Sequence, residues 1–331
     1  MARKTSFQDV LDTLLDSKKP ISQGHLKLYS DLDPESLRLF SNVWTNVPPK
    51  RKLLLLDKLV EHFDKDTLVS YEEIGKSLLD DPDAEVRARA IRLLIESEDP
   101  KLVGKILGIY LADAESAPRM EALNVLGEFL LLGEYEKISE DLERKIEDAL
   151  ISVIRDEGNA DLRRRSLEIL GFSSRMEIPT LIESAFERSD PAWVSSALRA
   201  MGHSQDERWN EDVIGKLLDE ETPVKAAAVE AAGALGIQES VPVLIQLLDD
   251  EEEDEDVAAA AIWSLSQIGG DEARTYLVGL ADQTEDEELS DLLEEAIENL
   301  DFAEELNKFD LFSFEDEDEL DLEEEDLDKD K

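Results

Sequence analysis

The chain has 331 residues, of which 82 are acidic and 35 are Lys or Arg, so its formal net charge is -47, and it contains no cysteine. The absence of cysteine excludes disulfides, thiolate metal ligands and cysteine nucleophiles, and it fits a reducing compartment. The negative charge repels nucleic-acid phosphates, so we expect no nucleic-acid partner, and it attracts basic proteins. The alternative reason for such a charge is the solubility of a long surface.

The first residues lack the apolar run of a signal peptide, because Asp9 and Asp12 interrupt it. No stretch approaches the ~20 apolar residues that cross a bilayer. We therefore expect a cytoplasmic, monomeric protein that makes no membrane contact.

Residues 1–75 show the apolar spacing of helices but no repeat. The spacing is clearest from Val10 to Leu15 and from Leu53 to Phe63. We expect a divergent N-terminal cap here, since terminal repeats must shield the core from water. Residues 1–60 are also the basic part of the chain, with ten Lys or Arg against seven acids, and they include the run Lys50-Arg51-Lys52.

From residue 76 to 301 a pattern recurs every 31–34 residues. Each copy has an apolar or proline anchor, then small or apolar residues four, seven and eight places on, and often a glycine directly after them. A period of this size predicts a solenoid of about seven or eight stacked helical hairpins. The anchors are Val86, Pro118, Leu162, Trp193, Val224, Val257 and Leu289.

Proline and glycine mark the expected helix ends. Asp33-Pro34 and Asp190-Pro191 are typical of helix starts, with the aspartate as N-cap. Glycines near the ends of the first helices are expected to form left-handed C-caps. The interval from Pro118 to Leu162 is 44 residues, which predicts a lengthened second helix or an inserted short helix around Glu134–Lys145. The expected C-cap glycines are Gly127, Gly171, Gly202, Gly236 and Gly269.

Two segments carry the repeat most clearly, Val86-Arg87-Ala88-Arg89-Ala90 and Val224-Lys225-Ala226-Ala227-Ala228. Their order of anchor, Arg or Lys, and spaced alanines resembles the short HEAT-like repeat of the phycobilin-lyase family, over roughly residues 80–300. The resemblance implies an all-α, right-handed superhelix whose second helices line the concave side. It is specific for fold, whereas this repeat serves many unrelated functions.

Three features of the repeat region are candidate sites. Trp209, flanked by Arg208 and Asn210 near the start of a second helix, is expected to be exposed on the concave side and to anchor a partner. Arg164, in the run Arg163-Arg164-Arg165, should point to solvent, where acidic neighbours pair with the run or leave a local anion site. The acidic run from Asp249 to Asp256 is expected to be a solvated loop, since it lacks the spacing of a calcium loop.

The segment from 302 to 331 abandons the repeat and is expected to be a disordered acidic tail. It contains an aromatic cluster that would cap the last repeat, dock on a partner or have no role. A further hypothesis is that the tail folds back on the basic run near Lys50 as weak autoinhibition. The partner-binding candidates of this segment are Phe309, Leu311, Phe312 and Phe314.

The sequence contains no catalytic, cofactor-binding or metal-binding motif. The only histidines are His25, His62 and His203, and we expect them to lie far apart. No His-Glu pair occurs, although the di-iron hydroxylases built on similar repeats need several.

We therefore expect no enzyme, no cofactor and no metal. The predicted function is a scaffold or adaptor that binds a protein partner, a basic one among the candidates, through its concave face and acidic tail. An accessory lyase-like enzyme acting on a protein-bound cofactor and an acidic chaperone for a basic protein stay open as alternatives.

Overall fold

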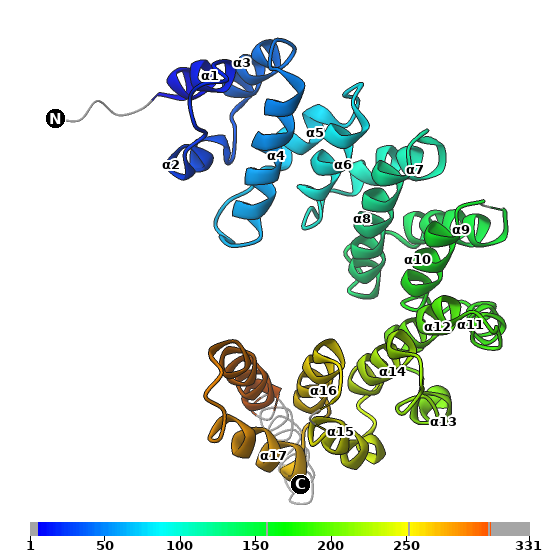
Figure 1. Ribbon diagram of the computed structural model, residues 1–331. Coiled ribbons are helices and arrows are strands. Elements are labelled where there is room, and N and C mark those ends of the chain that lie inside the picture. The colour runs from blue at the N-terminus through cyan, green and yellow to red at the C-terminus, as the bar shows by residue number, and fades with distance from the viewer. Residues whose placement is uncertain (1–5, 157, 251, 304, 306–331) are drawn as a thin grey trace, which may run out of the picture. The chain divides into compact units, whose positions relative to one another are not determined.

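The computed structural model describes residues 6–156, 158–250, 252–303 and 305, and every regular element in these ranges is a helix (Figure 1). The predicted all-α stack of helical hairpins is confirmed. The chain divides into two compact units, unit 1 (Met1–Ser166) and unit 2 (Leu167–Lys331). The limit between them falls inside the repeat region, and the predicted limits at residues 75 and 301 stay predictions.

Unit 1 combines the N-terminal helices with the first repeats. Its helices are α1 (Phe7–Leu15), α2 (Gln23–Leu26), α3 (Pro34–Trp44), α4 (Pro49–Phe63), α5 (Glu72–Leu78), α6 (Ala84–Arg92), α7 (Val103–Ala112), α8 (Ser116–Glu134) and α9 (Glu140–Asp156), and α10 (Ala160–Leu170) crosses its limit. The extra residues in the 44-residue interval from Pro118 to Leu162 lengthen the second helix, α9, as one of the two predictions stated, and also the first helix, α8.

Unit 2 continues the repeats. Its helices are α11 (Ile178–Phe186), α12 (Pro191–Ser204), α13 (Asn210–Ile214), α14 (Thr222–Ala234), α15 (Val241–Leu248), α16 (Glu255–Ile268) and α17 (Asp271–Ala281), followed by a helix over residues 287–303. Asp190 accepts a hydrogen bond from the N–H of Ala192 at the start of α12, as predicted for an N-cap before proline.

In each unit the helices form two layers. The first helix of each repeat packs closely on the first helix of the next, α6 on α8 in unit 1, and α12 on α14 and α14 on α16 in unit 2, whereas second helices contact one another far less (Figure 1). The more closely packed layer of a curved stack is its inner side. The concave side of unit 2 is therefore lined by first helices, and the implied arrangement with second helices on that side is wrong.

Glycines explain how the first helices approach so closely. A Cβ on Gly233 would lie 2.7 Å from the Cα of Ser264, and one on Gly202 would lie 3.1 Å from the Cα of Ala231. Gly171 lies against the carbonyl of Ala200 in the same way. In all three cases the glycine nine places after one anchor meets the small residue seven places after the next anchor.

The glycines were expected to be left-handed C-caps, and only two of the five have a positive φ. Gly236 and Gly269 have φ values of 62° and 71°. Gly127 and Gly202 lie inside α8 and α12, and Gly171 follows α10, without a positive φ. The sequence period locates these glycines correctly but does not distinguish a turn from a close helix contact.

The N-terminal helices share one core with the first repeat. Phe7, Tyr29, Phe40 and Trp44 form a continuous row with ring centroids 5.6, 6.2 and 5.1 Å apart. The same cluster of buried residues includes Val86, Ala90 and Leu93 of the first repeat. This shared core is what a capping region requires.

Arg51 and Lys52 of the basic run are engaged in contacts within unit 1. Arg51 is 6% exposed, and its guanidinium donates to the carbonyls of Thr13, Leu14 and Lys19, which closes the end of α1. Lys52 pairs at 3.0 Å with the buried carboxylate of Asp81. The hypothesis that an acidic tail binds this run therefore loses two of its three basic groups.

Asp81 joins α3 and α4 to the loop before α6. Its carboxylate accepts hydrogen bonds from the Trp44 indole at 2.7 Å, from Lys52 at 3.0 Å and from the N–H of Asp83 at 3.0 Å. Burial acts to raise the pKa of Asp81, but these hydrogen bonds outweigh it and hold the pKa below its usual value.

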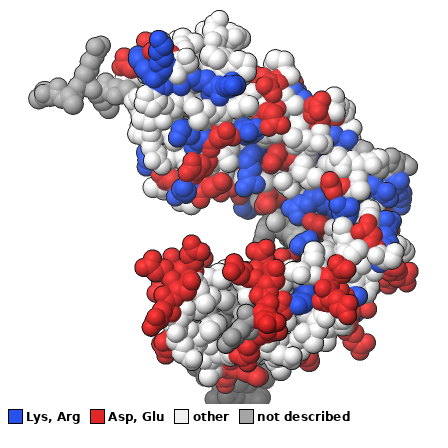
Figure 2. Space-filling view, in the orientation of Figure 1, with Lys and Arg blue, Asp and Glu red and all other residues white. Residues whose placement is uncertain are grey.

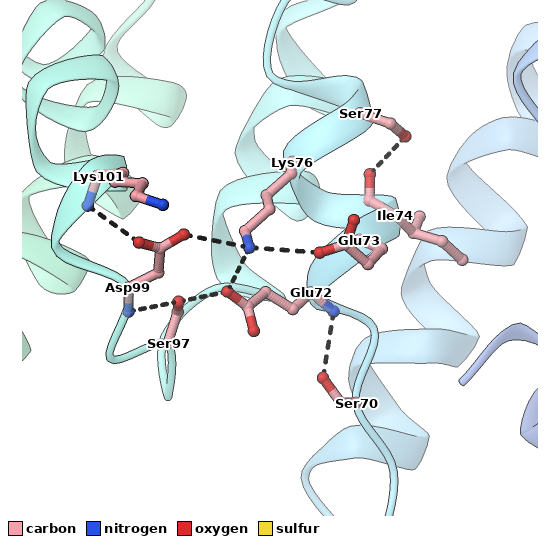
Figure 3. A network of polar contacts seen from close by, with 9 residues as sticks. All are labelled: Ser70, Glu72, Glu73, Ile74, Lys76, Ser77, Ser97, Asp99 and Lys101. Carbon is pink, nitrogen blue, oxygen red and sulfur yellow. Dashed lines mark hydrogen bonds and ion pairs between the residues drawn. The ribbon is translucent and has the colours of Figure 1, made fainter. Parts of the chain in front are cut away.

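A second network ties α5 to the loop after α6 (Figure 3). The ammonium of Lys76 lies 2.8 Å from Glu72, 3.3 Å from Glu73 and 3.5 Å from Asp99, and Ser97 donates to Glu72 at 2.7 Å. Partial burial opposes the charge of Lys76, but its bonds to the two glutamates raise its pKa overall. The network is partly exposed, so it orients these segments more than it stabilises them.

The glycine contacts give the first prediction. Gly233→Ala should lower the free energy of unfolding by roughly 1–3 kcal/mol, because the new methyl group overlaps the backbone of α16. The matched control is Gly279→Ala in α17, where nothing lies within 4 Å of the new Cβ, and which should be neutral or stabilise by about 0.5–1 kcal/mol. Urea unfolding measures both, and equal stability of the two variants would contradict the packing role.

The Asp81 network gives the second prediction. Asp81→Asn should cost about 3 kcal/mol at neutral pH, since Lys52, whose side chain is only 13% exposed, loses its charged partner. Because the folded pKa of Asp81 is lowered, its contribution is present above the unfolded pKa of about 3.9 and is lost as the pH falls through the folded value. The difference from wild type should therefore shrink in acid. Asp80→Asn, an exposed neighbour paired with Lys105, should cost under about 1 kcal/mol; a similar loss in both variants would disprove the account.

Candidate functional site

The arginine that follows the anchor has a structural role in three repeats of unit 1. The Nε of Arg119 donates to the carbonyl of Tyr110 at 2.7 Å, and the Nε of Arg163 donates to that of Ile154 at 2.8 Å. Arg87 donates in the same way to the carbonyl of Asp81. Each guanidinium thus binds a carbonyl near the end of the preceding second helix, where helix carbonyls lack partners.

The other two arginines of the run are engaged as well. Arg164 pairs with Asp161, and its side chain is only 21% exposed. Arg164 is therefore less exposed to solvent than expected. Arg165 donates to the side-chain oxygen of Asn124 at 3.1 Å. These contacts within unit 1 favour pairing over a local anion site.

Trp209 was expected to be exposed, and this is wrong. It is 3% exposed and belongs to the core of unit 2. The reason is local: Asp206 caps a short 3₁₀ turn, Glu207–Trp209, before α13, and this turn carries the indole inward. Arg208 lies over the ring with its Cζ 5.9 Å from the centroid. Trp209 is therefore a packing residue rather than a partner anchor.

The aromatic residues predicted to bind a partner, Phe309, Leu311, Phe312 and Phe314, lie outside the described residues. Their role as a docking segment stays a prediction.

The acidic run was predicted to be a solvated loop, but its last two residues, Glu255 and Asp256, already belong to α16. Asp254 accepts a hydrogen bond from the N–H of Asp256 at 3.0 Å, which caps α16. Glu253 binds Lys225 through both carboxylate oxygens at 2.9 and 2.8 Å. Among the residues that the structure describes, no group of His, Cys, Asp or Glu is arranged to hold a metal ion.

Two of the histidines lie closer together than expected. Tyr71 contacts the Nδ1 of His62 at 2.8 Å and donates to the carbonyl of Leu26, the residue after His25, at 3.3 Å. His203 belongs to unit 2, where its Nδ1 contacts the carbonyl of Glu168 at 2.7 Å and its ring stacks on Phe172. The expectation of wide separation is thus wrong for His25 and His62.

Negative charge is concentrated in unit 2. Unit 1 holds 25 Lys or Arg against 33 acids, whereas unit 2 holds 10 against 49. From residue 226 to 305 there are 24 acids and a single basic side chain, Arg274, which pairs with Asp301. Figure 2 shows acidic side chains crowded over the last repeats, with few basic ones among them. This surface attracts cations and repels anions.

Trp263 is an exposed aromatic residue in this acidic region. It is 41% exposed on α16, and within the described ranges no hydrogen bond is made by its indole N–H. Nothing in the sequence pattern indicates that Trp263 rather than Trp209 is the exposed tryptophan of these repeats. An exposed indole is the type of side chain that most often anchors a protein contact.

The repeat register shows what surrounds Trp263. It is the sixth residue after its anchor, and the same position is Arg199 in α12, Glu230 in α14 and Glu295 in the helix over 287–303. Arg199 and Glu230 pair at 2.9 Å, so side chains at this position of successive repeats touch. Trp263 therefore has a carboxylate position on each side. We call Glu230, Trp263, Gln267 and Glu295, all exposed, the Trp263 face.

Comparison with known proteins agrees with this architecture. Residues 211–298 match the family model of HEAT repeats. This segment of the chain therefore consists of HEAT repeats. The Trp263 face thus lies on the HEAT repeats, on their first-helix layer. None of the curated proteins compared with the sequence matches it.

Several solved structures resemble the chain. The complex of CpcE and CpcF of phycocyanin lyase from Nostoc is 17% identical with a TM-score of 0.46, over 69% of this chain and 94% of that chain. Human deoxyhypusine hydroxylase is 18% identical with a TM-score of 0.33, over 79% and 95%. Importin beta is 12% identical with a TM-score of 0.45, over 89% of this chain but 46% of its own. At these values none of the three identifies a partner or an activity.

In the described part of the chain, no helix has both the length and the apolar character to cross a membrane.

The exposure of Trp263 can be tested directly. The four tryptophans are Trp44, Trp193, Trp209 and Trp263, with exposures of 5%, 6%, 3% and 41%. Trp263→Phe should remove most of the fluorescence that acrylamide quenches, whereas Trp209→Phe should leave the quenching nearly unchanged. If Trp209→Phe removed the quenchable emission instead, the assignment of Trp263 as the exposed indole would be wrong.

Proposed function

We propose that this chain is a non-catalytic interaction module whose C-terminal repeats bind a basic segment of a protein partner, with the Trp263 face as the contact. The observation that carries the proposal is an exposed indole in a region of 24 acids and one paired arginine. The carboxylates attract Lys and Arg, and the indole offers apolar contact and cation–π stacking.

The small residues near the indole support a contact rather than a chance exposure. Ala259 and Ala260, one turn before Trp263 on α16, are half-buried, and each carries only a methyl group as its side chain. A partner segment can therefore reach the ring. Desolvation of an aromatic anchor contributes affinity, while the surrounding charges chiefly raise the association rate.

This proposal keeps the predicted concave-face contact but assigns it to first helices and to Trp263 in place of Trp209. The partner contact through the acidic tail is part of the same proposal and is supported only by the sequence of that segment. Binding of a basic segment is also what the cation-poor surface favours over binding of nucleic acid.

The experiment measures fluorescence anisotropy of a labelled peptide in which Lys alternates with Leu, with an all-Lys peptide of equal charge as the second probe. Trp263→Ala should weaken the Lys-Leu peptide by about 2 kcal/mol, or roughly thirtyfold in Kd. It should change the Kd of the all-Lys peptide much less. Glu295→Gln should weaken both peptides modestly and reduce the salt dependence.

The control is Met176→Ala, which removes an exposed apolar side chain, 94% exposed, from the turn before α11 in unit 2. It should leave both Kd values unchanged. Steeply salt-dependent binding that Trp263→Ala does not alter would contradict an anchored contact and favour the diffuse binding of an acidic chaperone. No binding of either peptide at low salt would disprove the proposal.

A further inference from the structure

A groove lies between the second helices α15 and α17 of unit 2, in the second-helix layer rather than on the Trp263 face. Its volume is about 720 Å³ and it is open to solvent. The groove exists because second helices pack on one another loosely while first helices are in close contact. Its lining consists of Ile245, Asp249, Asp271, Glu272, Thr275, Tyr276, Gly279, Leu280 and Gln283.

Gly279 is the feature of this groove that packing does not explain. It lies inside α17, where glycine destabilises a helix relative to alanine. Its φ is not positive, and a Cβ placed on it would meet nothing within 4 Å. Gly233, by contrast, has no room for a Cβ. Glycine is therefore not required at position 279 for a close contact within the fold. Its lack of a side chain instead keeps the groove open between Ile245 and Leu280.

The rim of the groove is acidic and ordered. The hydroxyl of Tyr276 donates to Asp249 at 2.9 Å, which holds the end of α15 against α17. Burial, together with that bond and the nearby charge of Asp249, raises the pKa of Tyr276 to about 12, so the phenol stays protonated. Asp271 and Glu272 are exposed at the start of α17, and among the described residues that line the groove there is no Lys or Arg.

The same construction occurs one repeat earlier. A groove of about 540 Å³ between α13 and the start of α15 has an apolar wall of Ile214, Leu218 and Val243. Gly215 also lines it, and its rim carries Asp219, Glu220 and Glu221. Two neighbouring grooves with apolar walls, a glycine and carboxylate rims thus follow one another along the second-helix layer of unit 2.

We propose that the α15–α17 groove is a second docking site, which takes an apolar side chain of a partner segment while a neighbouring Lys or Arg of that segment meets Asp271 and Glu272. The apolar wall requires a hydrophobic group, and the rim without cations requires a positive one. The acidic segment of this chain beyond residue 306 has the wrong charge for the rim, so the occupant is a separate basic-apolar polypeptide. This inference goes beyond the proposed function, because it uses the opposite layer of the repeats.

The test uses the full chain and a Lys-Leu peptide that carries a photo-crosslinker at one apolar position. Crosslinks should map to α15 and α17 in addition to α16. Gly279→Leu fills the groove with a side chain that a helix tolerates, so it should abolish the α15 and α17 crosslinks without lowering Tm. In a Trp263→Ala background, where the indole contact is absent, it should raise the peptide Kd by roughly tenfold, the loss of one inserted side chain.

Controls separate this site from the Trp263 face. Gly279→Ala adds only a methyl group and should leave most of the crosslinking in place, and Asp271→Asn with Glu272→Gln should weaken it. Trp263→Ala should remove the α16 crosslinks alone. The groove proposal is overturned if Gly279→Leu leaves the α15 and α17 crosslinks intact, or if deletion of residues 306–331 is needed before they form.

Discussion

The close approach of successive first helices is the constraint on which the rest of the structure depends. Gly171, Gly202 and Gly233 each leave the space of one Cβ, and the small residues Ala200, Ala231 and Ser264 of the next repeat occupy it. Helices that touch almost backbone to backbone fix the spacing of repeats on one layer. The second helices are then spread apart, because the outer side of a curved stack is longer than its inner side.

This asymmetry gives the two layers of unit 2 different surfaces. The inner layer is continuous, with side chains in rows one repeat apart, and it places Trp263 between carboxylate positions. The outer layer is interrupted by grooves such as the one between α15 and α17. Both surfaces belong to residues 226–305, which contain 24 acidic side chains and one basic side chain. The fold therefore supplies position, and the charge selects a basic partner.

The sequence predicted the architecture well, because anchors and small residues recur with a period that only stacked hairpins satisfy. It also located the capping aspartates and the start of α16 at the acidic run. The sequence-based prediction failed where a short local turn determines whether a side chain is buried or exposed. The 3₁₀ turn Glu207–Trp209 places Trp209 in the core, whereas Trp263 on α16 is exposed, and the sequence pattern does not distinguish the two. The glycine roles and the layer on the concave side likewise depend on packing between repeats.

The most direct test of the account is the response of the four indole N–H signals in a ¹⁵N NMR titration with a Lys-Leu peptide. The Trp263 signal should shift progressively and saturate, while those of Trp44, Trp193 and Trp209, which are buried, stay in place. A peptide that binds without moving the Trp263 signal, or that moves the buried indoles instead, would contradict the claim that this residue anchors a basic partner.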